Sequence, residues 1–177
     1  MKTLTLLRHA KSSWADPGQS DFERPLNARG RKAARAMGRE MRRLGLGYDH
    51  ILASPAARTM ETLTELAQGY GGAVATDPEP RIYLAPPAVL LDIVHGADDA
   101  WERLLLVGHN PGMEQLALAL SQRNALQERL ATKYPTGALA EIALPVAHWR
   151  KVVEGAGTLT RFVRPRDLDA ALGPDQD

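Results

Sequence analysis

The chain of 177 residues contains no cysteine, which excludes disulfides, thiolate zinc sites and cysteine nucleophiles. Aromatic residues make up only 5% and do not alternate with basic ones, so a stacking platform for single-stranded nucleic acid is poorly supported. The apolar run over residues 4–7 is too short for a signal sequence or a membrane span. We therefore expect a cytoplasmic protein that uses neither a membrane nor a nucleic acid as its partner.

Charge is nearly balanced overall, at +1, but it is unevenly distributed. Residues 1–60 carry 12 Lys and Arg against 5 Asp and Glu, or +7, and residues 61–177 carry 10 against 16, or −6. Much of the positive charge lies in residues 29–43, where an apolar stripe at helical spacing runs through Met37 and Met41. Because the arginines fall mostly off this stripe, a solvated helix face explains them better than binding of nucleic acid.

Strand and helix patterns alternate along the chain. We expect strands at 3–8, 50–53, 104–107, 138–144 and 158–163, weaker strand candidates at 73–75 and 81–84, and helices at 27–44, 54–70, 87–95 and 111–122. This alternation predicts an α/β protein, a three-layer α/β/α sandwich around a mainly parallel central sheet. Residues 1–164 are expected to form a single domain, and the polar residues 165–177 a frayed tail.

Two helix starts carry recognisable capping signals. Asn27 precedes the first predicted helix, and Ser54 with Pro55 is interpreted as the N-cap and first helical position of the second. The buried stripe of that second helix is predicted to consist of Met60, Leu63, Ala67 and Tyr70.

Basic side chains follow three predicted strands. Arg8 and His9 end the first, Arg58 lies in the first turn after the second, and His109 follows the apolar run of residues 104–107. Taken alone, each is better explained without chemistry, as a surface or ion-paired arginine or as a capping or core histidine. Since the carboxyl ends of parallel strands share one edge of a sheet, all four are expected to converge there.

Such a cluster suits chemistry on a phosphoryl group. Arginine pairs bidentately with phosphate oxygens, and a histidine before a helix N-terminus is placed to bind an anion. His9 is then the expected nucleophile, kept neutral near pH 7 by the surrounding cations. Water would hydrolyse the phospho-His9 intermediate. This mechanism needs no cofactor, and no metal-binding motif is present.

Five motifs stand in order along the chain: Arg8-His9-Ala10-Lys11-Ser12, Asp21-Phe22-Glu23-Arg24-Pro25-Leu26, Ala53-Ser54-Pro55, Val107-Gly108-His109-Asn110-Pro111-Gly112 and Pro135-Thr136-Gly137-Ala138. With them the chain resembles the histidine phosphatase superfamily, of phosphoglycerate mutase-like fold, and most closely its SixA-type phosphohistidine phosphatases. The resemblance extends to about residue 140. It implies that Arg8, His9, Arg58 and His109 form the catalytic and phosphate-binding site.

The departures from the family pattern narrow the expected substrate. Ala10 replaces the usual glycine, and Ala15 stands where mutase-like members often hold a phosphate-binding asparagine. The glutamate acid of the mutase-like branch is missing, because residues 83–87 contain no carboxylate. A positioned acid raises the reaction rate roughly 10²–10⁴-fold when the leaving group is an alkoxide. A chain without one is expected to favour phosphohistidine, whose imidazole leaves more easily, or activated phosphates over sugar phosphates.

Some roles stay open at this stage. Asp21 and Glu23 are candidate substitute acids, and solvation or pairing with Arg24 explains them equally well. Ser12 is a candidate phosphate ligand or an ordinary loop residue. We expect a hydrolase in signal transduction, monomeric or weakly dimeric, acting on a phosphohistidine-bearing protein or a small phosphorylated substrate. The alternatives are a broad phosphomonoesterase of the same fold and a phosphate- or phosphoprotein-binding module without catalysis.

Overall fold

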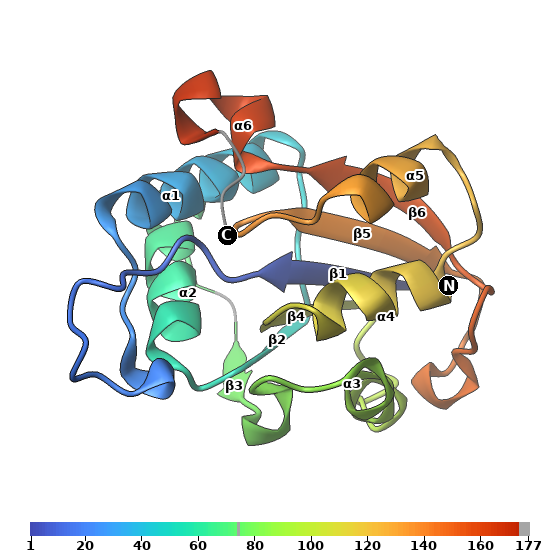
Figure 1. Cartoon of the computed structure of the whole chain (residues 1–177). Helices are drawn as coiled ribbons and strands as arrows, with labels where there is room; N and C mark the ends of the chain where they lie inside the picture. The colour runs from blue at the N-terminus through green and yellow to red at the C-terminus, as the bar shows by residue number, and fades with distance from the viewer. Residues whose placement is uncertain (74, 174–177) are drawn as a thin grey trace.

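A six-stranded sheet in the order β3-β2-β4-β1-β5-β6 forms the centre of the protein (Figure 1). The computed structural model describes residues 1–73 and 75–173. Strands β1 to β4 pair in parallel, whereas β5 pairs in antiparallel orientation with β1 on one side and with β6 on the other. The sheet is therefore mainly parallel, as predicted. The strands are β1 (Lys2–Arg8), β2 (His50–Ala53), β3 (Thr76–Pro78), β4 (Arg103–Gly108), β5 (Leu139–Leu144) and β6 (Thr158–Val163).

Helices cover both faces of the sheet, which confirms the predicted α/β/α sandwich (Figure 1). One face packs against α1 (Ala28–Arg43), α2 (Ala57–Tyr70) and α6 (Pro165–Leu168). The other packs against α3 (Pro87–His95), α4 (Gly112–Leu120) and α5 (Ala125–Thr132). Short 3₁₀ turns complete the chain: η1 (Asp21–Glu23), η2 (Pro80–Ile82), η3 (Trp149–Lys151) and η4 (Ala170–Leu172). Among the described residues, no helix is long and apolar enough to cross a membrane.

The unbroken apolar run of β4 follows from its position in the middle of the sandwich. Leu104 and Leu106 pack into the core on the α3–α4 face, and Leu105 and Val107 pack into the core on the α1–α2 face. Every one of these side chains is fully buried. Burying one such side chain contributes about 1.5–3 kcal/mol. Because β4 is covered on both faces, apolar and polar residues do not alternate along it.

The start of α1 is fixed against the segment that follows β1. The Asn27 side chain accepts a hydrogen bond from the Gly30 N–H at 2.8 Å, which confirms the predicted N-cap. Gly30 lies so close to the Lys11 carbonyl oxygen that a Cβ there would overlap it. The Asn27 N–H also donates to that carbonyl at 3.0 Å. These contacts hold residues 9–12 in place beside the sheet edge.

Two of the predicted element boundaries are wrong. The second helix begins at Ala57 rather than at Ser54, because the Ser54 hydroxyl is engaged with His109 and with the Ala56 N–H. The strand predicted at 81–84 is instead the turn η2, in which Pro80 occupies a first helical position and Glu79 caps it. For the candidate at 73–75, residue 74 lies outside the described residues, and the strand observed nearby is β3.

Two packing predictions also need correction. The predicted apolar stripe of α2 is buried only in part: Leu63 and Tyr70 pack against the core, but Met60 is 37% exposed. Leu66, which the prediction omitted, is buried. Helix α2 packs closely on α1, where Gly38 of α1 lies against the Leu66 carbonyl. The predicted fraying is wrong for residues 165–172, which form α6 and η4, and Arg29 Nη2 donates to the Leu172 carbonyl at 2.7 Å. Residues 174–177 lie outside the described part of the chain.

Candidate active site

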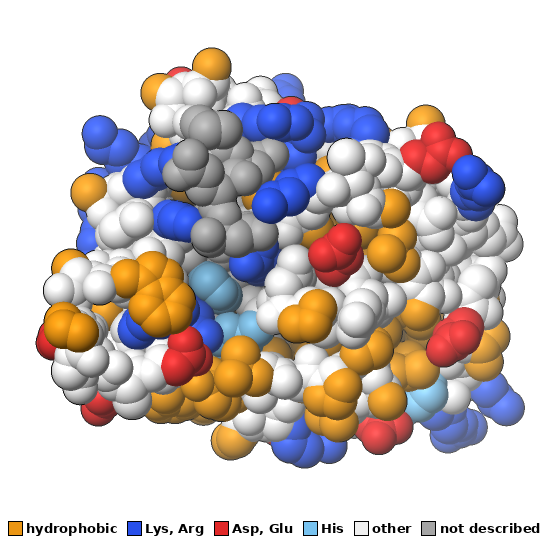
Figure 2. Space-filling model, in the orientation of Figure 1, with side chains coloured by type: hydrophobic (Ala, Val, Ile, Leu, Met, Phe, Trp, Pro, Cys, Tyr) orange, Lys and Arg blue, Asp and Glu red, His pale blue; other side chains and the backbone are white. Residues whose placement is uncertain are grey.

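The carboxyl ends of β1, β2 and β4 bring the predicted site residues together. His9 follows β1, Arg58 lies in the first turn of α2 after β2, and His109 follows β4. All three line one pocket of about 250 Å³, together with Arg8 at the end of β1. In Figure 2, imidazole side chains lie in a hollow bordered by Lys and Arg side chains. The strand order β2-β4-β1 explains this convergence, because these strands are parallel neighbours.

The His9 ring is held in one orientation. Its Nδ1 lies 2.7 Å from the Ala10 carbonyl oxygen, which can only accept, so Nδ1 carries the proton. The lone pair is then on Nε2, toward which the Nε–H of Arg58 points at 3.3 Å. Burial, supported by the charges of Arg58 and Arg8, outweighs the hydrogen bond to the Ala10 carbonyl and lowers the pKa of His9 well below 6.5. The ring is therefore neutral at pH 7 and presents an unprotonated nitrogen to the pocket.

Arg58 is almost completely buried, at 2% exposure, and its side chain donates to His9 and Asp21 within the site. Its Nη1 donates to the Asp21 carbonyl at 2.6 Å, and its Nη2 donates to Asp21 Oδ2 at 3.0 Å. The backbone carbonyl of Arg58 accepts from the Thr62 hydroxyl at 2.6 Å, and Thr62 accepts from the Ala10 N–H at 2.9 Å. Thr62 thus fixes α2 to the segment that holds His9.

His109 is paired with a buried serine. Its Nε2 lies 2.7 Å from Ser54 Oγ, and that oxygen accepts from the Ala56 N–H at 3.3 Å. The Ser54 oxygen can accept from Nε2 or donate to it. We infer that it donates, so that the proton of His109 lies on Nδ1 and is available to the pocket. Among the described residues this buried Nδ1 has no hydrogen-bond partner. Burial, then the Arg58 charge, lowers the pKa of His109 to about 3. A neutral N–H donor is therefore left in the pocket wall without an acceptor.

Positive charge dominates the pocket. Arg8, Lys11, Arg24 and Arg58 line it, and Asp21 is the carboxylate among the described lining residues. An arrangement of several guanidinium groups around a neutral histidine suits a multiply charged anion.

Asp21 lies on η1 and accepts hydrogen bonds from Tyr83 Oη at 2.6 Å, Arg58 Nη2 at 3.0 Å and Arg24 Nε at 3.2 Å. Burial raises the pKa of Asp21, but the hydrogen bonds from Tyr83 and Arg58 outweigh it and lower the pKa to about 2. The carboxyl group is thus ionised at pH 7 and has no proton to give. The tentative role of Asp21 as a general acid stays a prediction, and the ionised state of this carboxyl group does not favour it.

The other tentative site residues have different outcomes. Glu23 is exposed and accepts from the Ser20 hydroxyl at 3.0 Å, outside the pocket lining. Ser12 does line the pocket, where its Oγ accepts from Arg24 Nη1 at 2.8 Å, leaving its own proton to donate. The alternative in which Asp21 pairs with Arg24 is observed, at 3.2 Å. Sequence reasoning missed the hydrogen bond from Arg24 to Ser12 and the role of Tyr83. Arg24 lies in a quoted motif, whereas no local pattern marked Tyr83.

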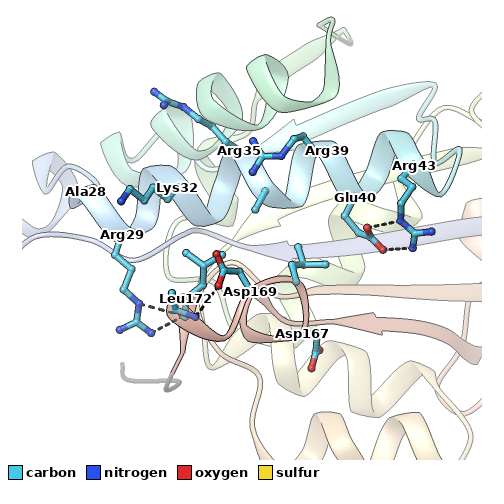
Figure 3. A pocket seen from close by; sticks show the side chains of 13 residues that line it. Ala28, Arg29, Lys32, Arg35, Arg39, Glu40, Arg43, Asp167, Asp169 and Leu172 are labelled. Atoms are coloured by element: carbon cyan, nitrogen blue, oxygen red, sulfur yellow. Dashed lines mark hydrogen bonds and ion pairs between the residues drawn. The ribbon is translucent and has the colours of Figure 1, made fainter.

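A larger hollow of about 900 Å³ lies elsewhere, between α1 and the α6–η4 segment (Figure 3). It contains neither of the pocket histidines. Basic side chains of α1 border it, several of them in contact with neighbours: Arg43 pairs with Glu40, and Arg29 donates to the Leu172 carbonyl. Lys32 and Arg39 are exposed, as a solvated helix face predicts.

No group of three or more His, Cys, Asp or Glu side chains that could hold a metal ion occurs within residues 1–73 and 75–173. The site is therefore defined by two neutral histidines and several guanidinium groups at the edge of a parallel sheet. This arrangement suits an anion and presents an unprotonated ring nitrogen, Nε2 of His9, to it.

The comparisons with known proteins agree with this class. Residues 4–81 match the family model described as histidine phosphatase superfamily (branch 1). An uncharacterised protein of Mycobacterium tuberculosis is 32% identical over 164 residues, which cover 90% of this chain and 100% of that protein. The chain belongs to the histidine phosphatase superfamily.

Solved structures show the same fold. A protein from Agrobacterium tumefaciens, provisionally named phosphohistidine phosphatase SixA, is 29% identical, with a TM-score of 0.79 over 93% of this chain and 98% of that one. The protein histidine phosphatase SixA, complexed with tungstate, is 19% identical, with a TM-score of 0.77 over 94% of this chain and 99% of that one. These likenesses establish the phosphoglycerate mutase-like fold and support a phosphatase.

Proposed function

We propose that the protein is a phosphatase that hydrolyses phosphohistidine in a protein through a covalent phospho-His9 intermediate. The observation that carries this proposal is the His9 ring. Its Nδ1–H is bound to the Ala10 carbonyl, so an unprotonated Nε2 remains in a pocket of arginines. A neutral imidazole nitrogen beside phosphate-binding guanidinium groups is the arrangement that nucleophilic attack on phosphorus requires.

In the first step the Nε2 lone pair of His9 attacks phosphorus, and the phosphorus–nitrogen bond of the substrate breaks. The leaving imidazole nitrogen takes the electron pair. Arg8 and Arg58 bind the phosphoryl oxygens, and the Nδ1–H of His109 donates to one of them, which supplies its missing acceptor. In the second step water attacks phosphorus, phosphate leaves, and the electron pair returns to His9. Neither step requires a metal or another cofactor.

The choice of substrate rests on the protonation state of the pocket. Departure of an alkoxide is accelerated by a proton donor, and the carboxyl group in this pocket, Asp21, is ionised. Imidazole is a far better leaving group. The similarity to SixA structures supports the same choice, and a cytoplasmic signalling role on a phosphohistidine-bearing protein belongs to this proposal.

A turnover panel tests the substrate. Purified protein is given a histidine-phosphorylated protein, free phosphohistidine, 4-nitrophenyl phosphate and 3-phosphoglycerate. We expect the phosphoramidates to give the highest kcat/KM, and His9→Ala to abolish turnover. His148→Ala, which removes an exposed histidine paired with Asp99, is the matched control and retains activity.

Two results would redirect the proposal. Faster turnover of phosphoglycerate than of phosphohistidine indicates a phosphomonoesterase of the same fold. Binding of phosphate or a phosphoprotein without any turnover indicates a module that has lost catalysis.

A further inference from the structure

The carboxylate of Asp21 has a position that the reaction steps above do not use. It lies in the pocket that contains His9, yet its side chain is 41% exposed, whereas that of its partner Arg58 is 3% exposed. The carboxylate therefore spans the boundary between the phosphate-binding arginines and the solvent from which a substrate arrives.

Its hydrogen bonds leave one acceptor position open. Within residues 1–73 and 75–173, Oδ2 accepts from both Arg58 and Tyr83, and Oδ1 accepts from Arg24 alone. Each carboxylate oxygen has two lone pairs, so Oδ1 retains one of them. The same partners fix the group in place and prevent it from rotating away.

We propose that Asp21 is a specificity-determining catalytic residue whose carboxylate binds the protonated imidazole ring of a phosphohistidine substrate and stabilises that ring as the leaving group. This inference rests on the proposed function. It replaces the missing general acid with an anion that selects a substrate already carrying its proton.

The chemistry of the leaving group explains the selection. In phosphohistidine one ring nitrogen bears phosphorus and the other can take a proton. When that proton is present, cleavage of the phosphorus–nitrogen bond returns the electron pair to the ring and releases neutral imidazole. When it is absent, the same cleavage must release an imidazolide anion. An alcohol ester has no such cation, so the carboxylate offers its leaving group no stabilisation.

The expected shift in the pKa of the substrate ring follows from the charge and the exposure of Asp21. An opposite charge within about 4–6 Å shifts a pKa by roughly 1–3 units. Because Asp21 is partly exposed, solvent screens the interaction and the lower end applies. The carboxylate is therefore expected to raise the pKa of the bound substrate ring by about one unit, which keeps the reactive imidazolium form at higher pH.

The test follows phosphoenzyme formation by rapid quench at saturating substrate, from pH 5 to 9. Free phosphohistidine is compared with 4-nitrophenyl phosphate, whose leaving group needs no cation. In the pH–rate profile of Asp21→Asn with phosphohistidine, we expect the alkaline limb to lie about one pH unit lower than in the wild-type protein. At pH 8 the ratio of the phosphohistidine rate to the 4-nitrophenyl phosphate rate should then be roughly tenfold lower than in the wild-type protein. Asp21→Glu restores part of the limb.

Glu23→Gln is the matched control, because it removes the same charge from the same turn outside the pocket lining, and it leaves the limb in place. Equal losses on both substrates with an unmoved limb would overturn the proposal, since Asp21 would then only position Arg58. A loss larger on esters would overturn it in favour of a general acid. If the wild-type protein does not turn over phosphohistidine, the proposed function itself fails.

Discussion

Replacing Ser54 by alanine isolates the contribution of the His109 tautomer. The Ser54 side chain is fully buried, and its oxygen lies 2.7 Å from His109 Nε2. Removing it leaves that nitrogen without a partner and allows the ring proton to move from Nδ1 to Nε2. His109 would then present a lone pair, instead of an N–H, to a phosphoryl oxygen.

The magnitude follows from the cost of an unpaired buried polar atom, about 1–3 kcal/mol. If that cost falls on the transition state, kcat/KM drops roughly 5- to 150-fold at about 1.36 kcal/mol per factor of ten. The same substitution also lowers the free energy of unfolding, so activity and stability must be measured together.

Steady-state kinetics with 4-nitrophenyl phosphate and urea unfolding provide both readouts. Ser121→Ala is the matched control: Ser121 is also buried, and its hydroxyl donates to the Ala117 carbonyl at 2.7 Å, at the end of α4. We expect Ser121→Ala to lose stability with kcat/KM within about twofold of wild type. Unchanged kcat/KM in folded Ser54→Ala would refute the tautomer assignment.

Three further outcomes are expected. Gly30→Ala costs about 1–3 kcal/mol in urea unfolding, because its Cβ would overlap the backbone against which α1 starts. The free energy of unfolding falls as pH drops below 6.5, because His9 and His109 take up protons in the unfolded protein at a higher pH than in the folded protein. Each of these histidines contributes up to about 1.4 kcal/mol per pH unit. In urea unfolding at several pH values, His9→Asn therefore makes the dependence on pH shallower. Tyr83→Phe raises the pKa of Asp21 above about 2 in a carboxyl NMR titration, because it removes a hydrogen bond to the ionised form.

The sequence predicted the parts of the fold that depend on local pattern. The apolar run of β4 and the Asn27 cap are signals within a few residues, and both agree with the structure. The start of α2 was misplaced because Ser54 has two possible partners. Its hydroxyl suits an N-cap, but the partner it finds, His109, lies 55 residues away in sequence.

The convergence of the site residues on one pocket could be predicted because parallel strands place their carboxyl ends together. Pairing of Asp21 with Arg24, three residues away, was one of the expected alternatives. The protonation state of Asp21 could not be predicted, because it also depends on Arg58 and Tyr83, which lie in distant segments. Tyr83 is 62 residues from Asp21 in sequence. A protonation state set by such contacts leaves no local pattern in the chain.

Trapping the phosphoenzyme tests the central claim most directly. The protein is mixed briefly with labelled phosphohistidine and quenched in alkali, and the modified peptide is identified by mass spectrometry. We expect acid-labile, alkali-stable phosphate on His9 of the wild-type protein and none on His9→Ala. Label on another residue, or full turnover by His9→Ala, would contradict nucleophilic catalysis by His9.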